Sequence, residues 1–262
     1  MVQPNSYFNS RSKASEESGI IVLAMGKLGS YELNYSSDID LIFLFDEKKY
    51  LPTSYLEIRS VFIKIVRNLV KLLSEVTEKG HVFRVDLRLR PDPSSNPICI
   101  GSNVAQNYYE IFGRNWERAA LVKARPICGD VRAGKSFLKR LFPFVWRKNL
   151  DFEAVSEVNN IRNQMELGTT DISLDLIPGH NIKTGAGGIR EIEFFTQAQQ
   201  LVTGGRDKNL RVSQTILALQ ALSYANWIPK RTEEKLIHCY KILRKIEHIL
   251  QLIDDAQTHS VP

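Results

Sequence analysis

The sequence predicts an α+β fold in which a sheet with its helices is followed by an all-helical bundle. Residues 20–24 and 41–45 are short, continuous apolar runs rich in β-branched and aromatic residues, and residues 81–90 alternate with a period of two. From Val131 onward the apolar spacing is almost wholly helical. Strands that precede the helices, instead of alternating with them, indicate the α+β class.

The first two apolar runs are expected to be strands that are covered on both faces. The turn between them contains Gly29 and Ser30. A glycine lets the backbone approach a ligand closely, and the serine adds a hydroxyl group to the N–H groups of the turn. We therefore predict that Gly29 and Ser30 bind phosphate oxygens.

A long helix is expected at 54–78, because its apolar residues recur at helical spacing and form a stripe that should cover one face of the sheet. The stripe consists of Ile58, Phe62, Ile65, Leu69, Leu72 and Val76. Prolines and turn-forming residues at 91–97 end the strand that follows this helix, and two shorter helices come next. Further helices are expected at 131–142, 151–167, 188–202, 212–225 and 232–255.

These patterns divide the chain into three parts. Residues 1–18 are expected to be a disordered N-terminal segment, because they lack apolar periodicity. Residues 19–130 form the predicted sheet domain, and residues 131–262 form the helical bundle domain.

Asp38 and Asp40 stand two residues apart at the start of the second predicted strand. Side chains alternate along a strand, so both carboxylates should project to one side and converge. Two like charges this close are unfavourable without a cation, and Mg²⁺ prefers carboxylates together with phosphate oxygens and water. The pair therefore predicts a metal and a phosphate. The alternative is an ordinary hairpin whose aspartates hold the connecting turn.

The stretch 81–90 places one acid among three cations on one face of a predicted strand. Arg84, Asp86, Arg88 and Arg90 alternate with apolar residues. Asp86 is a candidate third metal ligand beside Asp38 and Asp40, and the arginines are candidate phosphate ligands. A solvated edge with paired charges is the alternative.

A net charge of +6 and a pI near 9.2 suit phosphate-bearing or acidic partners. The sequence has no arginine-rich tail and no aromatic ladder for stacking bases, so nucleic acid is not expected as a partner. The cations concentrate instead at a few positions, which fits a nucleotide pocket. These positions are Arg84, Arg88, Arg90, Arg118, Lys123 and Arg125.

The sequence has no apolar run long enough to cross a bilayer and no signal-peptide pattern, which predicts a cytoplasmic protein without a membrane partner. Cys99, Cys128 and Cys239 are far apart and are not in Cys-x-x-Cys spacing, so neither a disulfide framework nor a zinc site is expected.

Several other residues are expected to have structural roles only. Trp116 is predicted to lie in the core. Arg244 and Glu247 stand three residues apart on a predicted helix, and a surface ion pair is the simplest interpretation. His238, His248 and His259 lack the spacing of metal ligands and are expected to be packed or solvated.

Together the motifs resemble the polymerase-β-type nucleotidyltransferase superfamily and, more narrowly, the family of bifunctional glutamine synthetase adenylyltransferase/adenylyl-removing enzymes. The matching stretches follow the family's order and span nearly the whole chain from about residue 20. They are residues 25–30, 34–43, 83–91, 113–118, 122–125 and 185–194. As a set they are highly specific, although Gly-Ser and Asp-x-Asp alone would be weak.

The forms of residues 113–118 and 187–193 look like the family's N-terminal half, which removes AMP from the adenylylated tyrosine of glutamine synthetase by phosphorolysis and gives ADP. The resemblance implies that Asp38, Asp40 and Asp86 hold Mg²⁺, or Mn²⁺, and that Arg190 closes over the nucleotide. It also implies a nitrogen-signalling regulatory trimer as a partner and a chain that is a fragment, truncated within its bundle domain. Two alternatives are adenylylation of glutamine synthetase with ATP and a non-catalytic module that binds nucleotide or a partner.

Overall fold

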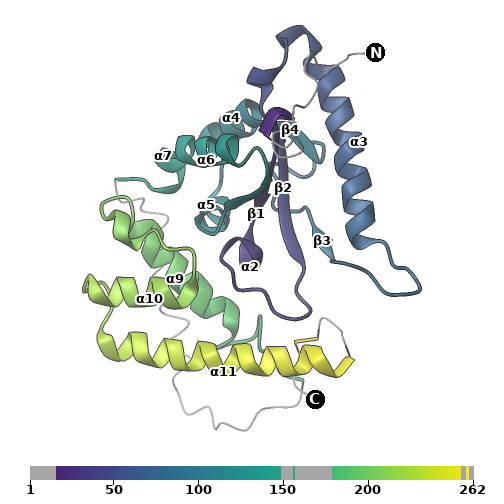
Figure 1. Cartoon of the computed structure of the whole chain (residues 1–262). Coiled ribbons are helices and arrows are strands. Elements are labelled where there is room, and N and C mark those ends of the chain that lie inside the picture. The colour runs from purple at the N-terminus through teal and green to yellow at the C-terminus, as the bar shows by residue number, and fades with distance from the viewer. Residues whose placement is uncertain (1–15, 149–155, 157–178, 255–257, 260–262) are drawn as a thin grey trace. The chain divides into compact units, whose positions relative to one another are not determined.

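The computed structural model describes residues 16–148, 156, 179–254 and 258–259 (Figure 1). Residues 1–15 of the predicted N-terminal segment lie outside the described residues, as does almost all of the predicted helix at 151–167. The chain divides into two compact units. Unit 1 comprises residues 1–29, 38–120 and 124–144, and unit 2 comprises residues 30–37, 121–123 and 145–262. The predicted division at residue 130 stays a prediction.

Unit 1 is built on a mixed sheet whose central strands are β1 (Ile20–Ala24) and β2 (Ile39–Phe45), which pair antiparallel. Strand β5 (Arg125–Gly129) pairs antiparallel with the side of β1 that faces away from β2. The side of β2 that faces away from β1 pairs in parallel with β3 (Val85–Asp86) and, further along, with β4 (Cys99–Gly101). This mixed sheet, accompanied by helices and followed along the chain by helical elements, confirms the α+β class (Figure 1).

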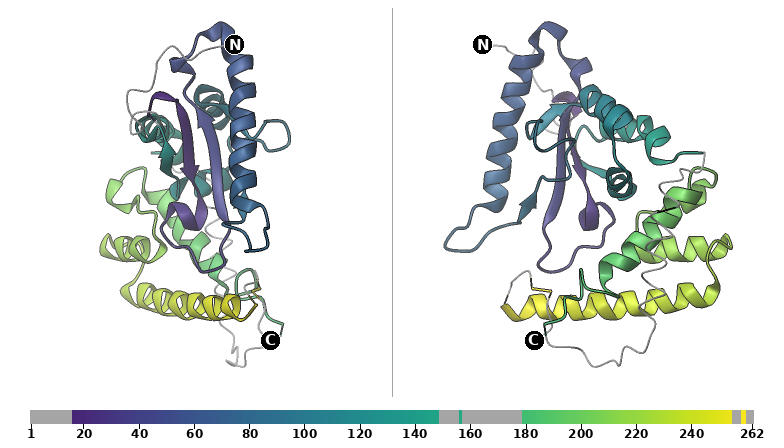
Figure 2. Two further views of the ribbon diagram at one scale, coloured as in Figure 1. Left: turned by 45° about the vertical axis from the view of Figure 1, so that its right-hand side comes forward. Right: turned by 180° about the vertical axis from the view of Figure 1, so that it is seen from behind.

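The core of unit 1 lies between the sheet and α3 (Tyr55–Ser74), which runs along one face of it (Figure 2). The predicted stripe on this helix is only partly right. Ile58, Phe62 and Val66 are buried, and they follow one another every four residues. Ile65 and Leu72 lie on the exposed side instead, and Val76 lies beyond the end of the helix and is also exposed. The sequence offered two apolar stripes, and only contact with the sheet selects one.

The strand predicted at 81–90 is wrong in length, because only Val85 and Asp86 are in a strand. Their partners on β2 are Ile39 and Asp40. Beyond this pair the chain turns, since the Asp86 carboxylate accepts the N–H of Arg88 at 2.8 Å. The alternation at 81–90 therefore does not correspond to one buried and one exposed face.

Strands β4 and β5 were not predicted, because three residues are too few to show a period and β5 contains Pro126. The two shorter helices are confirmed as α4 (Ser102–Phe112) and α5 (Asn115–Val122). Trp116 on α5 is 47% exposed, so its predicted core position is wrong. The buried side of α5 carries Glu117 and Arg118 instead.

The remaining short elements of unit 1 connect these larger ones. They are the helices α2 (Gly26–Gly29), α6 (Val131–Arg140) and α7 (Phe142–Val145), and the 3₁₀ helices η1 (Glu47–Lys49) and η2 (Pro52–Ser54). Asp130 caps α6 by accepting the N–H of Ala133 at 2.8 Å. The predicted helix at 131–142 is confirmed by α6.

Unit 2 contains α9 (Ile189–Thr203), the 3₁₀ helix η3 (Lys208–Leu210), α10 (Thr215–Tyr224) and the long α11 (Lys230–Asp254). The three α-helices confirm the helices predicted at 188–202, 212–225 and 232–255. Their apolar sides meet in one core, which includes Ile192, Leu219, Leu222 and Tyr240. Among the described residues, no helix combines the length and the apolar character that a membrane crossing requires.

Candidate functional site

The pairing of β2 with β3 brings the three predicted carboxylates together on unit 1. Asp40 lies directly opposite Asp86 in the parallel register. Asp38 comes two residues before Asp40, and the N–H of Ile39 between them donates to the carbonyl of Arg84 at 2.9 Å. Asp38 comes directly before the first residue of β2, so the alternation of side chains along a strand predicts that it lies on the same side as Asp40. Asp40 and Asp86 are neighbours on adjacent strands, near the start of β2.

Two arginines of the predicted site form ion pairs with two of these three acids. The Nε of Arg84 donates to Oδ1 of Asp38 at 3.0 Å. Arg88 donates to Oδ2 of Asp86 through Nε at 2.8 Å and through Nη2 at 2.5 Å. The Arg88 side chain is nevertheless 85% exposed.

The pKa values of Asp86 and Arg88 are both shifted by the ion pair between them. Burial acts to raise the pKa of Asp86, but the hydrogen bonds and charge of Arg88 outweigh it, so the pKa lies below its ordinary value. The pKa of Arg88 is raised by its hydrogen bond to Asp86 and by the charge of Asp86, and the charges of Asp40 and Asp38 contribute further. Arg88 is therefore attracted by all three acids.

The donor chemistry of this acidic group fits a magnesium ion, since carboxylate oxygens on two neighbouring strands are hard ligands. Within the described ranges, no group of three or more His, Cys, Asp and Glu side chains is arranged as a metal site. The carboxylates of Asp38 and Asp86 are instead paired with Arg84 and Arg88. An ion bound by Asp86 would have to displace the guanidinium of Arg88, whose side chain is 85% exposed. The metal-binding role of these aspartates stays a prediction.

The predicted phosphate turn is α2 and the residue after it. Gly26 has a φ of +49°, and a Cβ atom there would lie 2.6 Å from Oδ2 of Asp40, so only glycine lets α2 pack this closely on β2. The N–H of Gly29 donates to the carbonyl of Met25 at 2.9 Å. Ser30 is completely buried, and its hydroxyl donates to Oε2 of Glu32 at 2.7 Å.

Arg125 holds the end of this turn. Its Nη2 donates to the carbonyl of Leu28 at 2.9 Å and its Nε to the carbonyl of Gly29 at 3.2 Å. Carbonyl groups at the end of a helix lack partners within the helix, and a guanidinium group supplies them here. Arg125 thus fixes the position of α2 relative to β5.

In unit 1, Arg90 and Arg118 are two further predicted phosphate ligands, and each donates to groups near it in the sequence. Arg90 donates to the carbonyls of Leu87 and Pro93 at 2.9 and 2.8 Å and so holds the loop around it. Arg118 is fully buried and donates to Asn115 Oδ1 at 3.0 Å. In unit 2, Lys123 is buried and Arg190 is exposed on the first turn of α9. Phosphate binding by these four residues stays a prediction.

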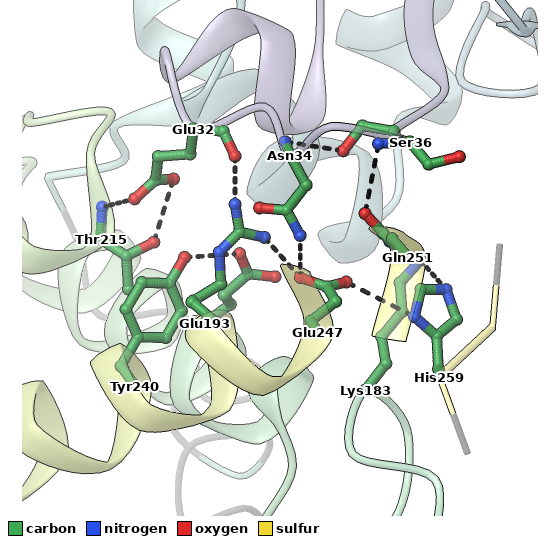
Figure 3. Close-up of polar contacts among 12 residues, drawn as sticks. Glu32, Asn34, Ser36, Lys183, Glu193, Thr215, Tyr240, Glu247, Gln251 and His259 are labelled. Atoms are coloured by element: carbon green, nitrogen blue, oxygen red, sulfur yellow. Dashed lines mark hydrogen bonds and ion pairs between the residues drawn. The ribbon is translucent and has the colours of Figure 1, made fainter. Parts of the chain in front are cut away.

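Unit 2 contains a buried polar cluster that the sequence interpretation missed (Figure 3). Lys123 donates to Glu32 at 3.1 Å, to Glu193 at 3.2 Å and to Thr215 at 3.3 Å. Tyr240 donates to Glu193 at 3.2 Å. The rest of the cluster lies on the segment 30–37 and on α11. Those residues are Asn34, Ser36, Arg244, Glu247 and Gln251.

The expectation that Arg244 and Glu247 form a surface pair is wrong. Their ion pair of 2.9 Å is buried, with side-chain exposures of 15% and 0%. A signal in the sequence was available, because Glu247 and Gln251 follow Tyr240 by seven and eleven residues and thus lie on its face of the helix. Charged residues on an apolar helix face need buried partners.

Two family models and several curated proteins match this chain. The family model described as glutamate-ammonia ligase adenylyltransferase matches residues 3–140, and the model described as GlnD PII-uridylyltransferase matches residues 161–262. The chain is similar to the bifunctional glutamine synthetase adenylyltransferase/adenylyl-removing enzymes of Bradyrhizobium diazoefficiens, Bartonella quintana and Rhizobium meliloti, with 49% identity to each.

The matches cover 95%, 97% and 96% of this chain and 25%, 26% and 25% of the three relatives. The chain therefore spans about a quarter of the length of the curated relatives it matches. The comparisons confirm the resemblance inferred from the sequence motifs.

Proposed function

Because the chain belongs to the glutamate-ammonia ligase adenylyltransferase family, we propose that it is a magnesium-dependent nucleotidyltransferase that acts on glutamine synthetase. The observation that carries this proposal is the register of β2 and β3, in which Asp40 lies opposite Asp86, while Asp38 comes two residues before Asp40. Carboxylates grouped in this way are suited to hold the metal of a phosphoryl-group transfer.

We propose that the reaction is removal of AMP from an adenylylated tyrosine. An oxygen of inorganic phosphate attacks the phosphorus of the AMP–tyrosyl bond, the bond from that phosphorus to the tyrosine oxygen breaks, and its electron pair leaves with the tyrosine. The products are ADP and free tyrosine. A tyrosinate leaving group needs little protonation, since the pKa of tyrosine is about 10, so no general acid is required. The forms of residues 113–118 and 187–193 support this direction.

Different residues of unit 1 would bind the metal ion and the phosphate oxygens. Asp38, Asp40 and Asp86 would hold Mg²⁺ or Mn²⁺, which when bound offsets negative charge on the transferring phosphoryl group. Arg84 and Arg88, released from their ion pairs with Asp38 and Asp86, would bind the phosphate oxygens. Arg125 keeps the turn of α2 in place by holding the carbonyls of Leu28 and Gly29.

Two partners follow from the proposal. Adenylylated glutamine synthetase is the substrate that the names of the relatives suggest. The match of residues 161–262 to a PII-uridylyltransferase supports a regulatory partner of the PII type, the nitrogen-signalling trimer expected from the sequence.

The test is a pair of reactions with the purified chain and Mg²⁺. One contains adenylylated glutamine synthetase and phosphate, and the other contains unmodified synthetase and ATP. We expect ADP in the first reaction only. Pyrophosphate release in the second would instead establish the adenylylating direction, and turnover in neither would refute the proposed enzyme.

Matched variants connect the activity to the acidic group. Replacing Asp40 and Asp86 by asparagine should lower kcat by about a thousandfold or more, because carboxylates that bind a catalytic metal contribute several kcal/mol. Glu57 on α3 is exposed, so Glu57→Gln removes a carboxylate elsewhere on the same unit and should leave kcat unchanged.

A non-catalytic module is the second candidate, and one observation favours it. Asp38 and Asp86 are already paired with Arg84 and Arg88, as they would be in a site that binds nucleotide without a metal. In that case the wild-type chain would bind ADP equally well with EDTA and with Mg²⁺ and would show no turnover.

A further inference from the structure

The loop of residues 87–98 in unit 1 joins β3 to β4, and both of these strands pair with β2 (Figure 1). Asp86 lies opposite Asp40 near the start of β2, and Cys99 lies opposite Phe43 further along the same strand. The chain thus leaves β2 after Asp86 and soon returns to it. Because β3 is only two residues long, its pairing with β2 supplies few hydrogen bonds to hold Asp86.

Arg90 lies within this loop and binds its main chain at several points. Its Nη1 donates to the carbonyl of Leu87 at 2.9 Å, and its Nη2 donates to the carbonyl of Pro93 at 2.8 Å. Its Nε makes a longer contact of 3.5 Å with the carbonyl of Asn96. Because a guanidinium group presents its donors in a fixed planar fork, Arg90 holds the two sides of the loop at a defined separation.

The part of the loop that follows Arg90 is itself hydrogen-bonded. The carbonyl of Asp92 accepts the N–H of Ser95 at 3.2 Å and the N–H of Asn96 at 2.9 Å. The side-chain amide of Asn96 donates to the carbonyl of Pro91 at 3.1 Å. The groups to which Arg90 is bound on this side of the loop therefore belong to a defined turn.

Contacts with the rest of unit 1 hold this turn in place. Leu87 and Ile98, at the two ends of the loop, pack against the core between the sheet and α3. Tyr108 on α4 is hydrogen-bonded to the backbone of Asp92. Burial is the largest cause that raises the pKa of Tyr108, and this hydrogen bond acts in the opposite direction. The turn is thus attached to a helix as well as to the sheet.

One peptide group connects Arg90 to Asp86. The carbonyl that Nη1 of Arg90 binds belongs to Leu87, and the N–H of the same peptide group belongs to Arg88. This N–H donates to Oδ1 of Asp86 at 2.8 Å. A trans peptide group is planar, with its C=O and N–H pointing in opposite directions. By holding the carbonyl, Arg90 therefore aims the N–H at the carboxylate of Asp86.

The contacts of Arg90 differ from those expected of a phosphate ligand. Arg90 is partly buried, and its Nη1 and Nη2 already donate to carbonyls of its own loop. If Arg90 turned toward a phosphate, it would leave these carbonyls without that donor, which costs free energy where they are shielded from water. Arg88, in contrast, has a side chain that is 85% exposed.

We propose that Arg90 is a positioning residue, which fixes the peptide group between Leu87 and Arg88 and thereby orients the carboxylate of Asp86. The inference rests on the proposed function, because Asp86 is one of the carboxylates proposed to hold the metal ion. A carboxylate that accepts a hydrogen bond at one oxygen is restricted in its rotation, so it presents its other oxygen in a defined direction. Removing such support from a metal ligand costs about ten- to a hundredfold in metal affinity or activity.

The experiment compares three variants of the full chain. Arg90→Lys keeps the positive charge but loses the planar fork that bridges two carbonyls. Asn96→Ala removes the amide that holds the turn and leaves the side chain of Arg90 in place. Arg67→Lys is the matched control, since Arg67 is an exposed arginine on α3 of the same unit. Three quantities are measured. They are the affinity for Mn²⁺, the rate of ADP formation as the phosphate concentration is varied, and amide hydrogen exchange at Arg88 and, for comparison, in α3.

In Arg90→Lys we expect Mn²⁺ affinity and kcat each to fall by about ten- to a hundredfold, with KM for phosphate within about twofold of wild type. The effects of Asn96→Ala should have the same direction and be smaller, about threefold. Exchange at Arg88 should become faster in both variants, while exchange in α3 stays as in wild type. A purely structural role would lower the amount of folded enzyme and leave Mn²⁺ affinity and kcat per folded molecule unchanged.

The outcomes separate this inference from the proposed function. If the wild type is active and Arg90→Lys keeps its Mn²⁺ affinity and its exchange rate at Arg88, the positioning role alone is overturned. A raised KM for phosphate with unchanged Mn²⁺ affinity would also overturn it, because Arg90 would then bind phosphate directly. A wild type that forms neither ADP nor pyrophosphate overturns the proposed function, and the positioning role with it. If Arg90→Lys does not fold, Asn96→Ala decides by the same measurements.

Discussion

Arg88 competes with any cation for the carboxylate of Asp86. Its guanidinium donates to both oxygens of Asp86, yet most of its side chain is in solvent. An exposed ion pair of this kind is weak, because water and salt screen it. Arg88 therefore balances the charge of the acidic group while no ligand is bound, without blocking the site permanently.

The first prediction concerns Arg88→Ala. Removing the guanidinium frees Asp86 and takes away a positive charge near Asp38 and Asp40, so Mn²⁺ should bind roughly three- to tenfold more tightly at low salt. The affinity can be measured by titration with Mn²⁺ and paramagnetic resonance of the free ion. Arg132→Ala is the control, because that side chain is 86% exposed on α6 and pairs with Glu16. Equal Mn²⁺ affinity in wild type and Arg88→Ala would show that the three aspartates do not bind the metal.

At the scale of elements, α2 shows how local backbone geometry places a site residue. This four-residue helix packs against β2 at Asp40, and the N–H of Met25 donates to the carbonyl of Asp40 at 2.9 Å. Gly26 allows the contact in two ways, by its positive φ and by its missing Cβ. Arg125 holds the opposite end of α2 through two carbonyl groups.

The second prediction is that Gly26→Ala damages the acidic group more than the fold. The new methyl group would stand within 2.6 Å of Oδ2 of Asp40 and push this carboxylate aside, so Mn²⁺ affinity should fall. The positive φ adds a destabilisation of about 1 kcal/mol.

Gly80→Ala is the control for Gly26→Ala. Gly80 also has a positive φ, of +92°, but nothing lies within 4 Å of its Cβ position. It should lose similar stability in thermal unfolding and keep its Mn²⁺ affinity. Equal Mn²⁺ affinity in both variants would contradict the role assigned to Gly26.

On the scale of the whole molecule, each unit depends on carboxylates that are ionised in the folded state. In unit 1 the pKa of Asp130 is lowered, because hydrogen bonds from Ala133 and Lys49 outweigh burial. In unit 2 burial acts to raise the pKa of Glu32, but the charge of Lys123 and the hydrogen bonds from Ser30 and Thr215 hold it below its ordinary value. A carboxylate with a lowered pKa stabilises the fold above its ordinary pKa, and this stability is lost as the pH falls through the folded-state value.

The third prediction follows from the lowered pKa values of these two carboxylates. The melting temperature should stay nearly constant from pH 8 to about pH 5 and should fall below about pH 4.5, where unfolded carboxylates become protonated. In Glu32→Gln the melting temperature at pH 7 should be lower than in wild type, and the further loss in acid should be smaller. Circular dichroism melts between pH 3 and pH 8 test both statements, with Glu234→Gln, which changes an exposed carboxylate on α11, as the control. If the melting temperatures of wild type and Glu32→Gln depended on pH in the same way, the second statement would be contradicted.

Many structural features of this protein are determined by residues that are close together in the sequence. The apolar runs of β1 and β2, the helical periods of α3, α9, α10 and α11, and the spacing of Asp38 and Asp40 all depend on residues close together in the chain, which periodicity can detect. The stripe of α3 was only half predicted, because Val66 and Ile65 are equally apolar and only the sheet distinguishes them. The short strands β4 and β5 have no local signal at all.

By itself, the sequence determined the α+β class, the order of the main elements and the family, and it singled out the three aspartates as candidates. Only the tertiary structure decided that Asp40 lies opposite Asp86, that Arg84 and Arg88 pair with two of these acids, and that Glu247 is buried. The reason is physical. A period belongs to one segment, whereas the partner of a charged side chain comes from wherever the fold brings another segment beside it, as Asn34 and Glu247 demonstrate.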